Sequence, residues 1–199
     1  MGDDVSDRVA LFAYGSLVSA ASTGRTLGRE IRRSSVARLP GWRRRWSQVR
    51  DNRSTEKTFA HAESGAVPSH CLGLNLEPDS VGSGPNGVLL EVSDEELARL
   101  ATREIRYEVV DVTDAMRTGE AAGFARVVTF TAKPENFAPT PPPGAVILAP
   151  YLRAVEGAFG TIGAAELDLF RDTTGAPPVE IIEAVLVRDE IPAGNPRDW

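Results

Sequence analysis

The sequence is poor in the residues that carry disulfide, thiol and metal chemistry. Its only cysteine is Cys71, so no intramolecular disulfide can form. Two histidines and one cysteine supply too few soft ligands for a typical tetrahedral zinc site. We therefore expect neither a disulfide framework nor a metal site, and we assign no metal ligands.

Long apolar runs and an excess of positive charge are also absent. No apolar stretch approaches the roughly eighteen residues that read as a membrane span. The formal net charge is -6, which gives no support to a general nucleic-acid role. Residues 1–7 are acidic, whereas a secretory signal is basic and then apolar. Together these absences predict a cytoplasmic protein with no membrane partner and no nucleic-acid partner.

What remains has the composition of a globular protein. The 199 residues are 42% hydrophobic and 25% charged, enough for a substantial core. We find no internal repeat and no interdomain linker in the sequence. Residues 1–199 are therefore predicted to form a single domain, with residues 1–7 and 190–199 as tails.

Apolar alternation and turn residues predict more strands than helices. The predicted strands are 9–14, two strands that meet at a bend within 34–49, and then 70–76, 87–92, 107–112, 125–131 and 180–187. Helices are predicted over 20–27, 147–159 and 164–171, and over a fourth segment that follows a capping box, Ser93–Glu96, and runs to Thr102.

The order of these elements indicates the fold class. Strands mostly follow one another directly, which argues for an α+β domain with a largely antiparallel or mixed sheet that curls towards a small barrel. Residues 51–69 are polar and rich in Ser, Thr and Gly, and we interpret them as a long loop.

Two patterns resemble functional motifs but fit ordinary structure better. Residues 82–87 (GSGPNG) match G-x-G-x-x-G, yet a predicted strand follows and Pro85 interrupts the motif, so we interpret it as a turn. His70 and Cys71 are neighbours in a predicted strand and point to opposite faces, which excludes a dyad between them. We interpret them as a buried cysteine beside a surface histidine.

Arginines are dense between Arg29 and Arg53, with a peak at Arg43–Arg45. Two interpretations stay open for this stretch. It could bind phosphates or an acidic partner. Alternatively, it is the outward face of a strand whose other face packs Trp42 and Trp46, and we favour this second interpretation because the tryptophans alternate with the arginines.

Three further features carry little weight singly. Residues Tyr14–Leu17 (YGSL) close the first strand, where glycine permits close approach of a ligand and successive N–H groups can bind a carboxylate or an oxyanion. Glu104 lies at a helix-to-strand junction, from which a carboxylate can project into a cleft. Tyr107 opens the next strand and Tyr151 lies in the first turn of a helix. Taken alone, these are a turn, a surface glutamate and packed tyrosines.

Taken together, these features resemble the γ-glutamylcyclotransferase-like superfamily, which includes ChaC-like and AIG2-like proteins. Residues 12–17 (FAYGSL) are similar to its Y-G-S-L signature. Residues 87–107 resemble its strand, helix and catalytic-glutamate segment, and residues 141–157 resemble a later segment in which a tyrosine opens a helix. The similarity covers most of residues 9–160, although residues 51–69 and 114–123 match no element of the family.

The resemblance implies a small curled mixed sheet or barrel flanked by helices, and cleavage of γ-glutamyl compounds without metal or organic cofactor. In that reaction the α-amine of a small-molecule γ-glutamyl substrate attacks its own γ-carbonyl, closes the ring of 5-oxoproline and releases an amine. The implied catalytic acid/base is Glu104. The implied substrate-binding residues are Tyr14, Gly15, Ser16, Leu17, Tyr107 and Tyr151.

Physical chemistry is consistent with that assignment. Because nucleophile and electrophile belong to one molecule, the enzyme needs mainly to hold a near-attack geometry. One carboxylate can take the proton of the α-ammonium and return it to the departing nitrogen. The pattern does not separate glutathione from γ-glutamyl amino acids or amines, and it does not indicate an oligomeric state. The alternatives are a non-catalytic protein of this fold that binds a small metabolite, and a partner-binding domain that uses the arginine stretch.

Overall fold

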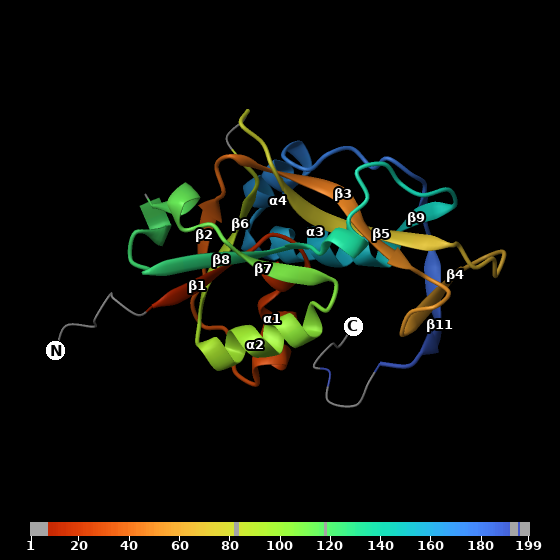
Figure 1. Ribbon diagram of the computed structural model, residues 1–199, viewed down its shortest axis with the longest axis horizontal. Helices are drawn as coiled ribbons and strands as arrows, with labels where there is room; N and C mark the ends of the chain where they lie inside the picture. The colour runs from red at the N-terminus through yellow and green to blue at the C-terminus, as the bar shows by residue number, and fades with distance from the viewer. Residues whose placement is uncertain (1–7, 82–83, 118, 192–194, 196–199) are drawn as a thin grey trace.

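Three β-sheets organise the fold, which a computed structural model describes for residues 8–81, 84–117, 119–191 and 195 (Figure 1). The first sheet contains, in spatial order, β2 (Ser35–Arg38), β6 (Asn86–Val92), β1 (Val9–Ala13), β8 (Arg126–Ala132) and β7 (Tyr107–Asp111). The second contains β10 (Ile181–Ile182), β9 (Ala145–Leu148), β5 (His70–Pro78) and β3 (Trp42–Asp51). The third pairs β11 (Ala184–Asp189) with β4 (Lys57–His61).

The first sheet is mixed and is built around β1. This strand is a run of small and large apolar residues, and all but its first residue are buried. It pairs antiparallel with β6 and parallel with β8, so that Leu11 lies opposite Leu90 on one side and Val128 on the other. Gly87 of β6 approaches β1 so closely that an added Cβ would lie 2.3 Å from the carbonyl oxygen of Ala13. Only glycine fits this position without a shift of the backbone.

The second sheet meets the first along β5. Strand β5 pairs antiparallel with β3, with an irregularity between Arg45 and Gln48, and parallel with β9. It also contacts β8, where the side-chain oxygen of Asn75 accepts a hydrogen bond of 2.8 Å from the main-chain N–H of Ala132. One strand therefore belongs to one sheet and supports the other.

In the described part of the chain, four helices flank the sheets (Figure 1). Helix α1 (Ala20–Leu27) packs against α2 (Asp94–Arg103), and α3 (Ala149–Ile162) packs against α4 (Ala164–Asp172). The predicted capping box opens α2: Ser93 Oγ accepts from the N–H of Glu96 at 3.2 Å, and the Glu96 carboxylate accepts from the N–H of Ser93 at 3.0 Å. None of the described helices is long and apolar enough to cross a membrane.

Short 3-10 turns complete the connections. They are η2 (Ser16–Val18), η3 (Asp114–Met116), η4 (Gly119–Ala121) and η5 (Pro134–Asn136).

The predicted α+β class, with a mixed sheet flanked by helices, is confirmed. The predicted tail 1–7 lies outside the described residues, as does most of 190–199.

The prediction of a loop over 51–69 is wrong in its centre. Strand β4 lies there and pairs antiparallel with β11, with Phe59 opposite Leu186. Its partner β11 is more than a hundred residues away in the sequence, and the residues before and after β4 are mostly polar. The strand is therefore stabilised by tertiary pairing rather than by a local apolar pattern.

Two predicted boundaries near the C-terminus also change. The helix predicted to begin at residue 147 begins at Ala149, because Ile147 and Leu148 complete β9 and pair with β10. The strand predicted over 180–187 is divided between β10 and β11, which belong to different sheets. Buried apolar runs do not distinguish a strand from the start of a helix.

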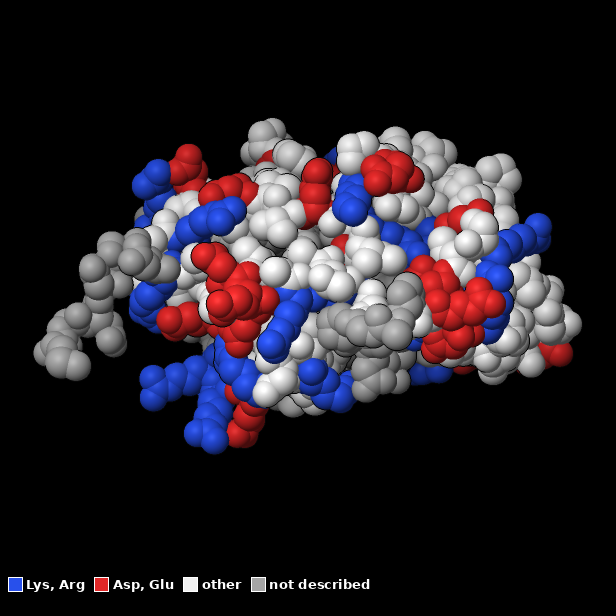
Figure 2. All heavy atoms as spheres, turned by 60° about the horizontal axis from the view of Figure 1, so that its bottom comes forward, with Lys and Arg blue, Asp and Glu red and all other residues white. Residues whose placement is uncertain are grey.

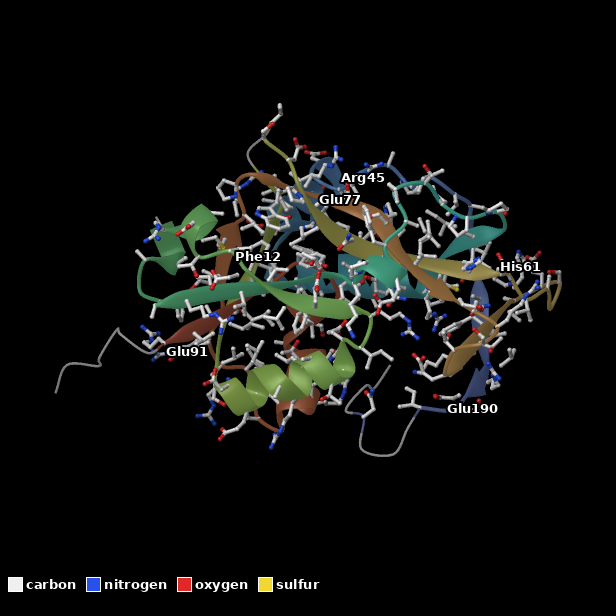
Figure 3. All side chains as sticks on the ribbon, viewed as in Figure 1. Phe12, Arg45, His61, Glu77, Glu91 and Glu190 are labelled. Atoms are coloured by element: carbon white, nitrogen blue, oxygen red, sulfur yellow. The ribbon has the colours of Figure 1, made fainter. Side chains whose placement is uncertain are left out.

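The favoured interpretation of the arginine peak as an outward face holds for only two of its three residues. The guanidinium groups of Arg43 and Arg45 lie 3.1 and 3.5 Å from the carboxylate of Glu77 on the neighbouring strand β5. Figure 3 shows Arg45 and Glu77 side by side. Arg44 is fully buried instead, because alternation along β3 turns it to the face of the tryptophans. Its guanidinium lies 4.6 Å from the ring centre of Phe170 and is hydrogen-bonded to Asn86.

Charges of both signs share the surface that carries α1 and α2 (Figure 2). Ion pairs there join Arg29 to Glu96 and Arg8 to Glu91. No single sign dominates this face in the view.

Candidate functional site

A cavity of about 250 Å³ lies between α1, the junction of α2 with β7, and strands β3 and β5. A smaller recess of about 30 Å³ adjoins it at the end of β1. Ser16, Glu104, Tyr107 and Tyr151 line both hollows, so the two form one continuous site.

Glu104 occupies a fixed position at the end of α2. Its N–H donates to the carbonyl of Leu100 and its carbonyl accepts from the N–H of Tyr107, each at 2.8 Å. The side chain is only 12% exposed and its Oε1 lies 3.1 Å from Nε of Arg103. The carboxylate is therefore withdrawn from bulk water and faces the same hollow as Ser16.

Arg103 ties this carboxylate to helix α1. It is 4% exposed, and its guanidinium donates to the carbonyl of Ser22 at 3.1 Å, to Ser22 Oγ at 2.9 Å and to Thr26 Oγ1 at 2.8 Å. A buried arginine with this many acceptors is held rigidly. Glu104 thus pairs with a cation that cannot swing away into solvent.

The Tyr14–Leu17 segment turns directly into η2 at the floor of the recess. The N–H of Val18 donates to the carbonyl of Gly15 at 3.0 Å, and Thr23 Oγ1 donates to the carbonyl of Leu17 at 2.8 Å. The first N–H groups of any helical turn lack acceptors within that turn. A Cβ on Gly15 would lie 3.6 Å from the Tyr151 hydroxyl, so glycine keeps this part of the recess open.

Tyr14 lies beneath the recess rather than beside it. The ring is 6% exposed and its hydroxyl donates to the carbonyl of Phe130 at 2.8 Å. Burial, followed by the proximity of Tyr151 and of Glu104, raises the pKa of Tyr14 well above its ordinary value. Its hydroxyl therefore stays protonated near neutral pH and supports the floor of the site.

Tyr107 and Tyr151 form two walls. The hydroxyl of Tyr107 donates to the carbonyl of Leu74 at 2.7 Å. Tyr151, in the first turn of α3, packs edge-on against Trp46 with ring centres 6.2 Å apart. All seven residues assigned from the sequence line the recess: Tyr14, Gly15, Ser16, Leu17, Glu104, Tyr107 and Tyr151.

The sequence did not indicate the residues at the other end of the cavity. Gln48 and Arg50 of β3 line it, as do Cys71 and Gly73 of β5 and Phe59 of β4. Both β3 and β5 contribute residues two positions apart, the spacing that places side chains on one face of a strand. That spacing was visible in the sequence, but nothing local showed that the two faces enclose a cavity.

Arg50 is the main charged group at this end. It is 8% exposed, donates to Asn52 Oδ1 at 3.2 Å and lies 5.0 Å from the ring centre of Phe59. Burial lowers the pKa of Arg50, although the hydrogen-bonded Cys71 thiol partly opposes that shift. Burial likewise raises the pKa of Cys71, so its thiol is neutral near pH 7. The predicted buried cysteine is confirmed, with His70 only partly buried.

Arg106 lies nearby but already has a carboxylate partner. Its guanidinium donates to both carboxylate oxygens of Glu56, at 3.0 and 2.5 Å. Within the described part of the chain, no group of three or more His, Cys, Asp and Glu side chains is arranged to hold a metal ion.

Comparison with known proteins rests on structure. No protein-family model matches the sequence. No curated protein matches it either. The fold is similar to that of YkqA from Bacillus subtilis, with a TM-score of 0.55 and 19% identity over 86% of this chain, which spans 56% of the YkqA chain. It is also similar to a solved γ-glutamyl cyclotransferase, with a TM-score of 0.51 and 12% identity, covering 89% of this chain and 95% of that one. At these identities the likeness concerns the fold, and the chain has the γ-glutamylcyclotransferase-like fold.

Proposed function

We propose that this protein is a γ-glutamyl cyclotransferase that acts on a small γ-glutamyl amide or amino acid and releases 5-oxoproline and an amine. The observation that carries the proposal is the shared recess, in which the Glu104 carboxylate and the start of η2 face the same space. The fold shared with a γ-glutamyl cyclotransferase supports it.

The proposed reaction needs one proton carrier. Glu104 takes a proton from the substrate's α-ammonium, and the freed amine attacks the γ-carbonyl carbon to form a new C–N bond. The old C–N bond then breaks as Glu104 gives this proton to the departing nitrogen, and the excess proton left on the new ring nitrogen passes through Glu104 to the released amine. Arg103 engages Oε1 of Glu104, so we assign the transfer to Oε2. The proposed steps use no metal and no organic cofactor.

The turn after Tyr14 supplies the electrostatic part of the proposal. Negative charge grows on the carbonyl oxygen as the tetrahedral intermediate forms. The N–H groups of Gly15, Ser16 and Leu17, at the beginning of η2, are the donors that we assign to it. Loss of one such donor in other enzymes costs about 3 kcal/mol.

The small recess at the end of β1, which we call the inner end of the cavity, is where we place the γ-glutamyl half of the substrate. A compact site favours a folded-back substrate in which amine and carbonyl are already close, and such proximity supplies much of the rate. Tyr14 and Tyr107 have hydroxyl groups committed to main-chain carbonyls, so we assign them to shaping the recess.

The test is the appearance of 5-oxoproline. The protein is incubated with glutathione, several γ-glutamyl amino acids and several γ-glutamyl amines, and 5-oxoproline and free amine are measured by mass spectrometry. We expect equimolar products from at least one substrate, and at least about a 100-fold loss in Glu104→Gln. The matched control is Glu108→Gln, because Glu108 is an exposed carboxylate on β7 outside the cavity.

Two outcomes would contradict the proposal. No 5-oxoproline from any member of the panel, together with ligand-dependent thermal stabilisation, would favour the alternative of a metabolite-binding protein. Undiminished turnover in Glu104→Gln would remove Glu104 from the mechanism.

A further inference from the structure

The wall between the two hollows carries a glutamine that the proposed reaction leaves without a role. On β5, Leu74 lines the small recess at the inner end, whereas its neighbour Gly73 lines the larger hollow. Tyr107 lines both, so this part of β5 marks their boundary. Gln48 is paired with Gly73 across β3 and β5, which lie side by side in Figure 1. Beyond this point is the outer end of the cavity, which is lined by Arg50, Phe59, Cys71 and Leu148.

The side chain of Gln48 lies over Gly73 because glycine leaves the space free. Residues paired across an antiparallel sheet present their side chains on the same face. A Cβ on Gly73 would lie 2.5 Å from Oε1 of Gln48 and 3.3 Å from the hydroxyl oxygen of Tyr107. The amide of Gln48 is therefore a neighbour of Tyr107, the tyrosine that borders both hollows.

One hydrogen bond fixes which side of the Gln48 amide is free to meet a ligand. Its Nε2 donates to the carbonyl oxygen of Val49 at 2.8 Å, and a carbonyl only accepts, so the NH₂ side must point there. Gln48 is only 6% exposed, and among the described residues no donor is hydrogen-bonded to its Oε1. A ligand that covers this oxygen without offering a donor loses the hydrogen bond that water would make, and a ligand with a donor keeps it.

The donor that suits Oε1 is a neutral N–H. A buried ammonium group needs a counter-charge, which a neutral amide oxygen does not supply, whereas an amide N–H needs only an acceptor. The proposed reaction places the γ-glutamyl half in the inner recess and the departing half in the larger hollow. The amide that joins the two halves therefore crosses the boundary beside Gly73 and Gln48.

We propose that Oε1 of Gln48 accepts a hydrogen bond from the N–H of the amide that is cleaved, and thereby selects γ-glutamyl derivatives of primary amines. These amides have one N–H, whereas γ-glutamyl derivatives of secondary amines have none. The inference rests on the proposed function for the position of the substrate and narrows the substrate class of that site. The departing nitrogen keeps this hydrogen throughout the reaction, so the contact lasts from the bound substrate to the released amine.

The test compares two substrates that differ by one methyl group on the departing nitrogen. The kcat/KM is measured for γ-glutamylalanine and γ-glutamyl-N-methylalanine in the wild type and in Gln48→Met. If the 5-oxoproline assay finds a better departing amine, the same pair is made from that amine. We expect the wild type to prefer the N–H compound, and this preference to fall by about 10-fold in Gln48→Met, the change for one neutral hydrogen bond. The intrinsic reactivity of the two compounds is the same with either protein, so the change in preference reports the contact with Gln48.

Two further variants separate this contact from a general weakening of the wall. Asn136 Nδ2 also donates to the carbonyl oxygen of Val49, at 3.2 Å, but Asn136 is outside the cavity lining. Asn136→Leu therefore removes a hydrogen bond to the same carbonyl and should keep the wild-type preference. Gly73→Ala leaves Gln48 in place chemically but displaces its amide, and should lower the preference in part.

Three results would overturn the inference. They are a wild-type preference near one, which needs no variant to fold, an unchanged preference in Gln48→Met, and an equal loss of preference in Asn136→Leu and Gln48→Met. Thermal melts of each variant accompany the assays.

A binding measurement separates this inference from the proposed function. The two compounds are titrated by calorimetry into Glu104→Gln and into the double variant that also carries Gln48→Met. Tighter binding of the N–H compound that is lost in the double variant, without turnover by the wild type, would uphold the contact and overturn the cyclotransferase proposal. Equal binding of the two compounds, with 5-oxoproline formed by the wild type, would overturn the contact and leave the cyclotransferase proposal standing.

Discussion

The two ends of the cavity are built in different ways. At the inner end, Tyr14 and Tyr107 donate to main-chain carbonyls and Glu104 pairs with an anchored arginine. At the outer end, side chains from three strands meet around Arg50, which contacts the Asn52 amide and the Phe59 ring and is influenced by the nearby charges of Glu56 and Arg106. The side chains of the inner end are thus held by fixed partners, whereas the outer end combines an apolar lining with a buried arginine.

This difference assigns different tasks to the two ends. A site in which every polar group is fixed suits the bond-making step, which tolerates little displacement. A site with a buried arginine and an apolar lining suits selection among ligands. Changes at the inner end should therefore reduce stability or turnover, and changes at the outer end should mainly alter selectivity or reactivity.

The largest effect is expected from replacing Arg103, the arginine that ties Glu104 to helix α1. Arg103→Met removes the partner of Glu104 and leaves acceptors on Ser22 and Thr26 without their donor. We expect the free energy of unfolding to fall by about 3 kcal/mol, because loss of one member of a buried charged network leaves the other unpaired. Urea denaturation measures it. Arg25→Met, at an exposed arginine of the same cavity, should cost less than about 0.5 kcal/mol. Equal costs in the two variants would contradict the comparison.

A smaller effect at the inner end should concern turnover alone. In Gly15→Ala the new Cβ makes only ordinary contacts, 3.6 Å from the Tyr151 hydroxyl and 3.8 Å from Leu74, so the fold should tolerate it. It occupies a recess of only about 30 Å³, however, and we expect kcat/KM to fall by about 10-fold or more. Steady-state assays with thermal melts check this. Gly157→Ala, on an open face of α3, is the control and should keep full activity.

Reactivity of Cys71 sharpens the comparison at the outer end. Because burial raises its pKa, the thiol should react with iodoacetamide at pH 8 at least about five-fold more slowly than in the unfolded chain. The folded state holds this proton more tightly, so the associated stability is present below the ordinary thiol pKa and is lost as pH rises through the folded value. Mass spectrometry follows the alkylation, and urea titrations between pH 7 and 10, with Cys71→Ala as reference, follow the stability. Fast alkylation at pH 7 would show that the outer end is open and the thiol ionised.

The smallest expected effect lies in the turn that leads from β3 to β4, and hence to Phe59. Ser54 and the N–H groups of Arg53 and Ser54 hydrogen-bond Asp51 and lower the pKa of its carboxyl to about 2. The carboxyl is exposed, so Asp51→Asn should cost less than about 1 kcal/mol at pH 7. A depressed pKa gives stability that is present above the ordinary Asp pKa of about 3.9 and is lost as pH falls through about 2. The difference between the two proteins should accordingly shrink between pH 4 and 2 in thermal melts, and a constant difference would contradict the assignment.

Most of the inner end could be predicted from the sequence because its parts are local. A capping box fixes the start of α2, and the helix length then places Glu104 at the junction with β7. The apolar run of β1 ends at Gly15 whatever surrounds it. The outer end could not be predicted in this way. Residues 57–61 carry no strand pattern of their own, and the arginine-rich strand gives no sign of which arginine turns inward.

The sequence by itself determined the α+β class, the caps and turns, and the positions along the chain of a strand-closing glycine segment and a carboxylate at a helix end. These follow from periodicity and local hydrogen bonding, which act over a few residues. Only the tertiary structure decided that Arg44 packs in the core, that Arg50 borders a cavity, and that β4 forms at all. Burial and pairing depend on elements that are distant in the chain, and the free energy of a charge depends on what surrounds it once they have assembled.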